Sequence, residues 1–219
     1  MTTASIDEAP YQLEEGHVCI DFVNTAYIQL DPAAAHGYHP TEEQLVDMPA
    51  LGAWVRELGL LPEAETALLT AQPTGADHAR LAQLRSGRES LRRLIRSRLL
   101  EQPPADDDLA AVNRAFAPVL GQTRLAATED GFQHRYALTA AAPDLAFALD
   151  HLTWTIARST FDLLTDPDEL DTIRECPGDD CGYLFRDASH GRRRWCSMKS
   201  CGNRAKVQRF RDRQKAGEG

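Results

Sequence analysis

Apolar residues recur every three or four positions along much of the first 170 residues, which is the spacing of an α-helix that buries one face. The strongest stretches predict long helices over about 77–100 and about 143–164. Asp47 and the aspartates at 106–108 are placed to open two further helices, because an aspartate can accept hydrogen bonds from the N–H groups of a first turn. A short helix is expected over 62–69, so the region is mainly α-helical.

Other stretches of this region have different patterns. Residues 17–28 form an apolar segment that is expected to be helical, and residues 31–46, which contain prolines and a glycine, are expected to form a loop. Residues 122–139 hold two roughly alternating stretches on either side of Glu129-Asp130-Gly131, which predicts a β-hairpin.

The breaker Asp166-Pro167-Asp168 ends the last long helix and places a domain boundary near residue 170. We therefore predict a mainly α (α+β) fold, with a helical domain that contains one hairpin over residues 12–170 and a small second domain over 171–216. No apolar run approaches the roughly 20 residues that span a bilayer. The acidic, polar start does not resemble a signal peptide, so a cytoplasmic location is expected.

Cysteines carry the clearest chemical signal in the second domain. Two C-x4-C pairs are separated by fourteen residues, and their members are Cys176, Cys181, Cys196 and Cys201. Such pairs can bring four thiolates to one tetrahedral centre, so one structural Zn²⁺ is predicted. A disulfide, redox or catalytic-zinc role is less favoured, since cytoplasmic thiols stay reduced and four thiolates leave no open coordination position. Cys19 lies in an apolar run and is expected to be a buried, unreactive thiol.

The residues around the cysteines predict a treble-clef-like zinc finger. Residues 183–186 and 193–195 are expected to pair as short strands between the two cysteine pairs, and residues 203–215 are expected to form a helix. Asn203 is a candidate N-cap, which would place Cys201 at the positive end of that helix, where a thiolate is favoured.

Charge is strongly segregated although the whole chain carries −9. Residues 172–219 contain 12 Lys/Arg and 6 Asp/Glu, a net charge of +6, whereas residues 1–171 contain 12 and 27, a net charge of −15. A basic module on an acidic body is typical of proteins that bind a polyanion through the module alone. Nucleic acid, and double-stranded DNA in particular, is the predicted partner.

The terminal helix should present most of this charge. Val207 and Phe210 form an apolar pair that is expected to pack on the zinc hairpin beside Trp195, while Arg209 and Arg213 line a flank. Lys and Arg contacts to phosphate would supply the affinity. A solvated basic face with no partner is the simpler alternative. The candidate nucleic-acid-binding residues are Arg192, Arg193, Arg194, Lys199, Arg204, Lys206, Gln208, Arg211 and Lys215.

Three polar residues interrupt the apolar run near the start of the chain. Asp21, Asn24 and Thr25 lie at i, i+3 and i+4 and would share one helical face. They either satisfy backbone groups in the core or line a small-molecule pocket, with Tyr27 or Trp54 as a wall. The second interpretation would make the first domain a ligand sensor.

Two motifs resemble known bacterial domains. The segment CSMKSCGNRAK at 196–206, preceded by Arg193-Arg194-Trp195, resembles the CGNR zinc finger, and CIDFVNT at 19–25 resembles the opening of the ABATE domain that precedes that finger. Together the two domains would cover about residues 12–215. The resemblance implies a stress-responsive transcription regulator of actinobacterial type, with zinc held by the four cysteines.

These observations predict a cytoplasmic, zinc-containing, DNA-binding transcription regulator whose first domain senses a small molecule. No Ser/His/Asp set, phosphate loop or nucleotide fingerprint is recognisable, so an enzyme is not predicted. Two alternatives stay open: an RNA-binding or ribosome-associated zinc protein, and a module whose basic helix docks an acidic protein. The sequence leaves the target site, the effector and the oligomeric state undetermined.

Overall fold

The computed structural model describes residues 15–73, 78–129, 131–137, 142–178, 181–189 and 191–217, and the side chains of 215–217 are not described. Residues 12–14 of the predicted first domain and Asp130 of the predicted hairpin turn lie outside the described residues.

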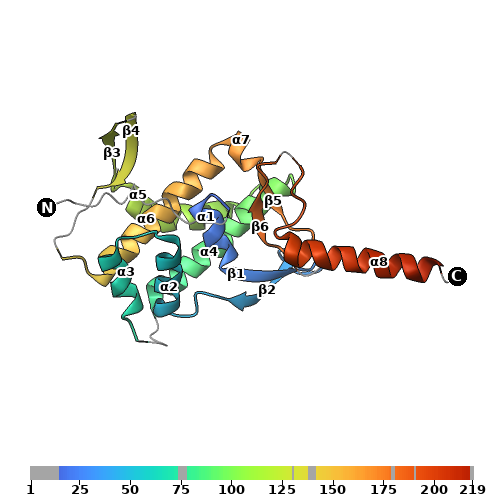
Figure 1. Cartoon of the computed structure of the whole chain (residues 1–219). Helices are drawn as coiled ribbons and strands as arrows, with labels where there is room; N and C mark the ends of the chain where they lie inside the picture. The colour runs from blue at the N-terminus through green and yellow to red at the C-terminus, as the bar shows by residue number, and fades with distance from the viewer. Residues whose placement is uncertain are drawn as a thin grey trace.

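A mainly helical body forms most of the structure, as predicted (Figure 1). Its helices are α1 (Val18–Asn24), α2 (Met48–Leu58), α3 (Glu63–Thr70), α4 (Ala79–Leu99), α5 (Asp106–Leu120), α6 (Leu145–Leu164) and α7 (Pro167–Leu170). Every residue of α1 is buried, because this helix packs against both α4 and α6 at the centre of the body. Within the described residues, no helix combines the length and the apolar character that crossing a membrane would require.

The sequence signals at the ends of α2 act as predicted. Asp47 accepts a hydrogen bond from the backbone N–H of Ala50 at 2.9 Å, and Gly59 ends the helix with a left-handed φ of 67°. The aspartates at 106–108 lie in the first turn of α5, where the helix dipole favours negative charge. The other helices expected in the body are confirmed, apart from the segment that includes α1.

A β-hairpin follows α1 where the sequence predicted otherwise. β1 (Ala26–Leu30) pairs antiparallel with β2 (Tyr38–Glu43). The helix predicted over 17–28 therefore ends at Asn24, and the loop predicted over 31–46 contains a strand.

Alternating burial explains this hairpin. Ala26 and Ile28 are buried whereas Tyr27 between them is exposed, which is the period of a strand and not of a helix. The register shifts between Tyr27 and Ile28, and Pro40 pairs with Ile28 next to this irregularity, where a strand tolerates a proline.

The predicted hairpin near residue 130 is confirmed. β3 (Thr123–Thr128) pairs antiparallel with β4 (Gly131–Tyr136). It projects from the body near α5 and α6, and Leu125 and Phe132 are exposed on it (Figure 1).

The strands of the C-terminal region pair differently from the prediction. β5 (Ile173–Glu175) pairs antiparallel with β6 (Leu184–Arg186), so Cys176 and Cys181 lie in the connection of this hairpin. Residues 193–195, which were expected to be the partner strand, have no strand structure. The order of elements is nonetheless that of a small zinc finger: hairpin, loop, second cysteine pair and helix.

A carboxylate binds the backbone that follows β6. Asp187 accepts hydrogen bonds from the backbone N–H groups of Ser189 and Gly191 at 2.9 and 2.6 Å. A hydrogen bond from the Ser189 hydroxyl, together with these N–H groups, lowers the pKa of Asp187 to about 2. These N–H groups are therefore unavailable to a strand ladder.

The buried guanidinium of Arg92 joins α4, α1, β1 and the finger. Its Nη2 donates to the carbonyl oxygens of Val23 and Ala26 at 2.5 and 2.6 Å, and its Nη1 lies 3.4 Å from the carbonyl oxygen of Gly182. The side chain is 1% exposed. Val23 lies in the last turn of α1, where carbonyls lack an i+4 donor within the helix, and Ala26 begins β1, so Arg92 donates to the chain where it turns from helix to strand.

The finger hairpin lies directly against the body. Asn24 donates to the carbonyl oxygen of Leu184 at 2.7 Å and accepts from its N–H at 3.0 Å, so its amide pairs with β6 as a neighbouring strand would. A Cβ at Gly182 would lie 2.4 Å from side-chain carbons of Ile28, so only glycine fits here. The close contact fixes β6 against α1 and β1.

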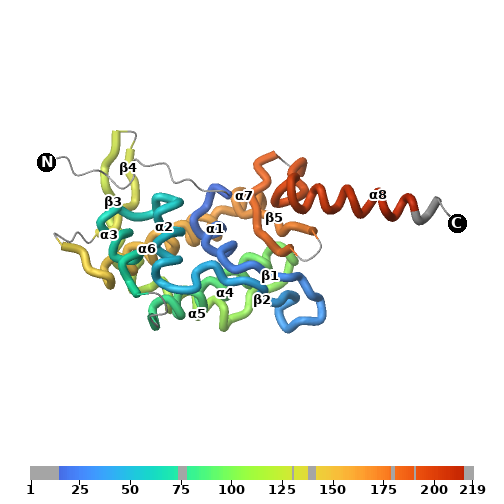
Figure 2. Tube along the Cα trace, turned by 60° about the horizontal axis from the view of Figure 1, so that its bottom comes forward, coloured from blue at the N-terminus to red at the C-terminus, as the bar shows by residue number. Residues whose placement is uncertain are grey.

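Ion pairs surround this contact. Arg96 of α4 pairs with Glu175 at 2.6 Å, Arg186 of β6 pairs with Glu169 at 2.8 Å, and Arg193 of the finger loop pairs with Glu15 at 2.7 Å. The finger therefore sits at one end of the body as part of the same packed structure (Figure 2).

We expect Arg92→Ala to lower the free energy of unfolding by about 3–5 kcal/mol, because it leaves buried carbonyls without donors and opens a cavity. Urea denaturation of the full chain measures this loss. Arg98→Ala is the matched control: its ion pair with Asp171 is half exposed and should contribute less than about 1 kcal/mol. Equal losses for the two variants would contradict the role given to Arg92.

Candidate metal centre and nucleic-acid interface

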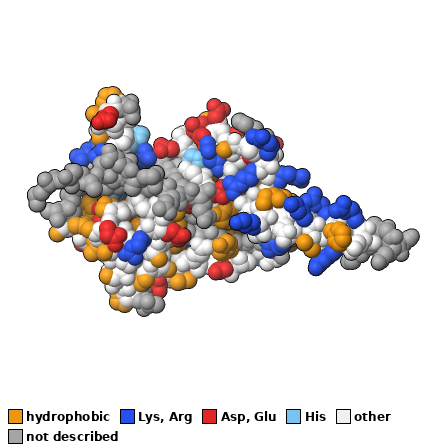
Figure 3. Space-filling view, viewed as in Figure 1, with side chains coloured by type: hydrophobic (Ala, Val, Ile, Leu, Met, Phe, Trp, Pro, Cys, Tyr) orange, Lys and Arg blue, Asp and Glu red, His pale blue; other side chains and the backbone are white. Residues whose placement is uncertain are grey.

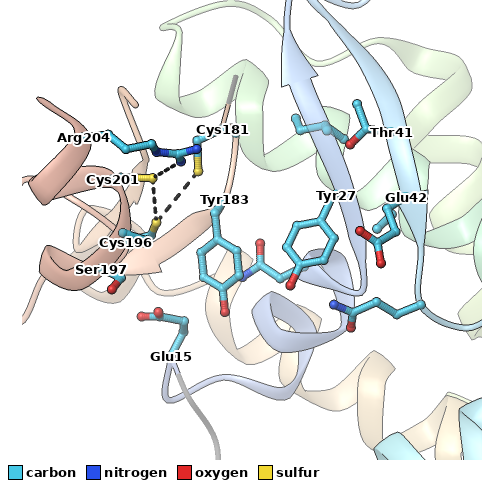
Figure 4. A pocket seen from close by; sticks show the side chains of 16 residues that line it. Glu15, Tyr27, Thr41, Glu42, Cys181, Tyr183, Cys196, Ser197, Cys201 and Arg204 are labelled. Atoms are coloured by element: carbon cyan, nitrogen blue, oxygen red, sulfur yellow. Dashed lines mark hydrogen bonds between the residues drawn. The ribbon is translucent and has the colours of Figure 1, made fainter. Parts of the chain in front are cut away.

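The four predicted cysteine ligands converge on one point. Their Sγ atoms all lie within 4.8 Å of one another. The Sγ of Cys196 is 3.8 Å from that of Cys181 and 3.6 Å from that of Cys201, and these three cysteines are labelled in Figure 4. A tetrahedron with Zn–S bonds of about 2.3 Å has edges of about 3.8 Å. The donor set and its spacing therefore fit one structural Zn²⁺.

Backbone geometry brings the two pairs together. The β5–β6 connection supplies Cys176 and Cys181, and the N–H of Cys196 lies 3.5 Å from the Sγ of Cys176. A Cβ at Gly178 would lie 3.0 Å from the Sγ of Cys201, so the first connection closely approaches the second pair, and a larger residue here would require a shift of a few tenths of an ångström.

The second pair enters the terminal helix through a π-helical turn, η1 (Met198–Gly202), which continues into α8 (Asn203–Gly217). Ser197 caps this turn and accepts a hydrogen bond from the N–H of Lys199 at 3.2 Å. The expected N-cap role of Asn203 is wrong, since its φ and ψ of −69° and −44° are already helical. Helical structure therefore begins directly after Ser197, and Cys201 lies within the π-helical turn.

Electrostatics inside the cluster favour a cation. A hydrogen bond from Cys181 lowers the pKa of Cys176 to about 5, whereas burial raises the pKa of Cys196 to about 12. The thiol of Cys181, as the donor to Cys176, also has a raised pKa. Four thiolates cannot share this space unless a divalent cation offsets their charge. Arg204 adds a charge-assisted hydrogen bond, with its Nη2 3.0 Å from the Sγ of Cys201.

Cys19 is the buried, unreactive thiol that the sequence predicted. Its Sγ lies 3.5 Å from the carbonyl oxygen of Ser159, and burial raises its pKa to about 12. It lies in α1 and takes no part in the cluster.

Helix α8 extends away from the body (Figures 1 and 2). Its apolar pair, Val207 and Phe210, does not pack on the finger. Val207 is 42% exposed and Phe210 is 56% exposed, so the expected contact with the zinc hairpin is wrong. The small core of the finger is instead formed by the cysteines, Phe185 and the partly buried Tyr183 and Trp195.

The basic residues predicted to bind nucleic acid fall into two groups. Arg193 is held by Glu15 and stacks over the ring of Phe185 at 4.7 Å, and Arg204 contacts Cys201. Gln208 donates to Asp212 at 2.9 Å, and the side chain of Lys215 lies outside the described residues. The remaining predicted residues are exposed: Arg192, Arg194, Lys199, Lys206 and Arg211.

The residues proposed for a ligand pocket do not line one cavity. Asn24 and Tyr27 border a cleft of about 680 Å³ between the β1–β2 hairpin and the finger (Figure 4). Thr25 instead donates to the carbonyl oxygen of Phe22 at 2.7 Å, Trp54 packs against the Phe22 ring, and Asp21 is buried within α1. The sequence did not reveal Tyr183, which borders the cleft from the finger side.

Replacing one ligand should remove the metal. We expect Cys201→Ser to lose the single bound zinc, measured by mass spectrometry of metals, and to expose residues 176–202 to hydrogen exchange, because metal binding stabilises such sites by about 10–16 kcal/mol. Cys19→Ser is the control with the same chemical change in the body and should keep one zinc. Full zinc content in Cys201→Ser would rule out the four-cysteine site.

Comparison with known protein families agrees with this geometry. Residues 16–167 match the ABATE family, described as "Putative stress-induced transcription regulator", and residues 172–214 match the CGNR zinc finger. Neither description names an enzymatic activity. No curated protein matches the chain. With the ABATE match covering more than half of its length, the chain belongs to the ABATE family and carries a CGNR zinc finger with four cysteines that can hold one zinc ion.

Proposed function

We propose that the protein is a transcription regulator that binds duplex DNA through α8, with the zinc centre fixing the base of that helix. The observation that carries the proposal is a set of exposed α8 cations that form no ion pair among the described residues. They are Lys206, Arg209, Arg211 and Arg213. Unpaired cations on one projecting element are the electrostatic footprint of a phosphate-binding surface (Figure 3).

The charge of the rest of the molecule supports this orientation. Residues 1–171 carry a net charge of −15, so the body is repelled by a polyanion while α8 is attracted to it. Because α8 points away from the body, the helix can approach a duplex without bringing the acidic surface close (Figure 1).

Basic residues near the base of α8 have two roles, contact with DNA and stabilisation of the finger. Arg192, Arg194 and Lys199 are exposed beside the start of the helix and would add contacts to the DNA backbone. Arg193 and Arg204 are assigned to the finger itself, since their guanidinium groups hold Glu15 and Cys201. The zinc ion is structural in this proposal, because four thiolates complete its coordination.

Helix geometry favours DNA over RNA as the partner. The major groove of B-form DNA admits an α-helix, whereas the major groove of A-form RNA is too narrow for side chains to read. An acidic protein is the alternative partner for the cations of α8. Duplex binding is distinguished by a linear fall of log K with log salt, which comes from the release of counterions from the duplex.

The cleft between body and finger supports a further regulatory role, the binding of a small effector. Its volume of about 680 Å³ is in the range of ligand pockets, and Tyr27 and Tyr183 offer it aromatic surface from the body and from the finger (Figure 4). A ligand bound between these two side chains would contact both the body and the finger and would change the stability of the contact between them.

We expect replacement of Lys206, Arg209 and Arg213 by Ala to weaken duplex binding and to flatten its salt dependence. Each lost phosphate contact removes about 0.9 from the slope of log K against log salt, or up to about 2.7 in total. Zinc content should not change, because none of the three contacts a cysteine. Fluorescence anisotropy with a labelled 20-bp duplex over a KCl series measures the slope.

Three exposed body arginines provide the matched control. Arg56, Arg114 and Arg124 replaced together by Ala remove the same charge, and we expect the original slope. Equal effects of both triple variants, or stronger binding to an RNA hairpin of the same length, would contradict DNA binding by α8.

We expect Tyr27→Ala to abolish the thermal shift produced by any metabolite that binds the cleft, because it removes one aromatic wall. Tyr27 is partly exposed, so its loss should leave the unliganded melting temperature nearly unchanged. Differential scanning fluorimetry against a metabolite library measures both quantities. A ligand that stabilises wild type and Tyr27→Ala equally would place its site elsewhere.

A further inference from the structure

Four residues of α8 form one continuous face that the finger does not cover. Asn203, Val207, Phe210 and Gln214 follow a 4-3-4 spacing, which at 3.6 residues per turn aligns them along one side of the helix. All four are exposed. We call this face the seam. It combines two apolar side chains with an amide at either end.

Cations border the seam on both sides. At the same helical spacing, Lys206 and Arg213 lie along one flank and Arg211 lies along the other, next to Arg204, whose guanidinium contacts Cys201. In the space-filling view, hydrophobic side chains on α8 lie among Lys and Arg side chains (Figure 3).

The face opposite the seam has the other charge. Asp212 is the one acidic side chain in the described part of α8, and it lies roughly opposite the seam, where Gln208 donates to it at 2.9 Å. The single group that would be repelled by phosphate is thus turned away from the face that the cations border.

We infer that the seam enters the major groove of duplex DNA and reads A·T base pairs, an inference that rests on the proposed function. A groove about 12 Å wide admits one helix, and the two basic flanks then face the phosphate strands on either side. The amides of Asn203 and Gln214 can each bond the N6 and N7 atoms of adenine. Val207 and Phe210 can contact the 5-methyl group of thymine, which is the apolar feature of that groove.

The charge pattern disfavours a second copy of the chain as the occupant. A 4-3-4 spacing also occurs in coiled coils, but the positions beside the seam are all basic and would repel one another across a dimer. Two apolar residues also fall short of the three or four heptads that a coiled coil needs. Duplex DNA instead supplies the opposite charge to both flanks.

The test uses the zinc-loaded full chain and a 20-bp duplex selected by it from a random pool. Each thymine of the selected site is replaced in turn by deoxyuridine, which removes the methyl group alone. We expect about a fourfold loss of affinity at each contacted thymine, the size expected for one buried methyl group. A Val207→Ala/Phe210→Ala variant should lose this discrimination while keeping the wild-type salt slope.

Gln208→Ala, on the opposite face, is the control and should keep the discrimination. If thymine and deoxyuridine bind equally and the seam variant selects the same sites, the inference is wrong, although salt-dependent binding would leave the proposed function standing. If the chain binds no duplex, both are wrong. A dimer in sedimentation experiments that Phe210→Ala dissociates, with discrimination unchanged, would assign the seam to self-association and overturn the inference.

Discussion

The position of the finger depends on one buried guanidinium. Arg92 lies inside the body, where burial lowers its pKa, and Glu89 at 3.9 Å and the ring of Tyr38 help to stabilise its charge. Its donors meet carbonyls that the chain leaves open as it turns from α1 into β1, and they also reach Gly182 of the finger. One side chain therefore satisfies the end of a helix and links two regions that the sequence separates by more than 150 residues.

A fixed finger gives α8 a fixed direction. Asn24 and the surrounding ion pairs hold β5 and β6 on the body, and the four cysteines tie the first turn of α8 to that hairpin. The body, with its net negative charge, and the basic helix thus form a single object. A finger on a loose linker could not keep the acidic surface turned away from a duplex, so the rigid junction matters for the proposed function.

Most local signals were readable from the sequence, the N-cap expected at Asn203 being an exception, and long-range pairings were not. The cap at Asp47, the stop at Gly59 and the spacing of the cysteines each depend on neighbouring residues, and each gave the correct structure. The strand β1 was missed because its pairing with β2 decides between helix and strand. For Asn24 the sequence left open both a backbone contact in the core and a ligand contact, because its backbone partner, Leu184, lies 160 residues away. The sequence of α8 likewise does not show whether its two apolar side chains pack on another part of the protein.

The metal centre stabilises the start of α8, a helix that would be only marginally stable alone. An isolated helix of 15 residues is marginally stable in water because its first turn is costly to form, and the cations along α8 repel one another. Ser197 and Cys201 form that first turn as part of the zinc site, so the helix starts from a nucleus that is already ordered. Repulsion still acts along the rest of α8, where the finger offers no compensating contact. A polyanion beside both flanks would remove that repulsion, so binding and helix stability would increase together.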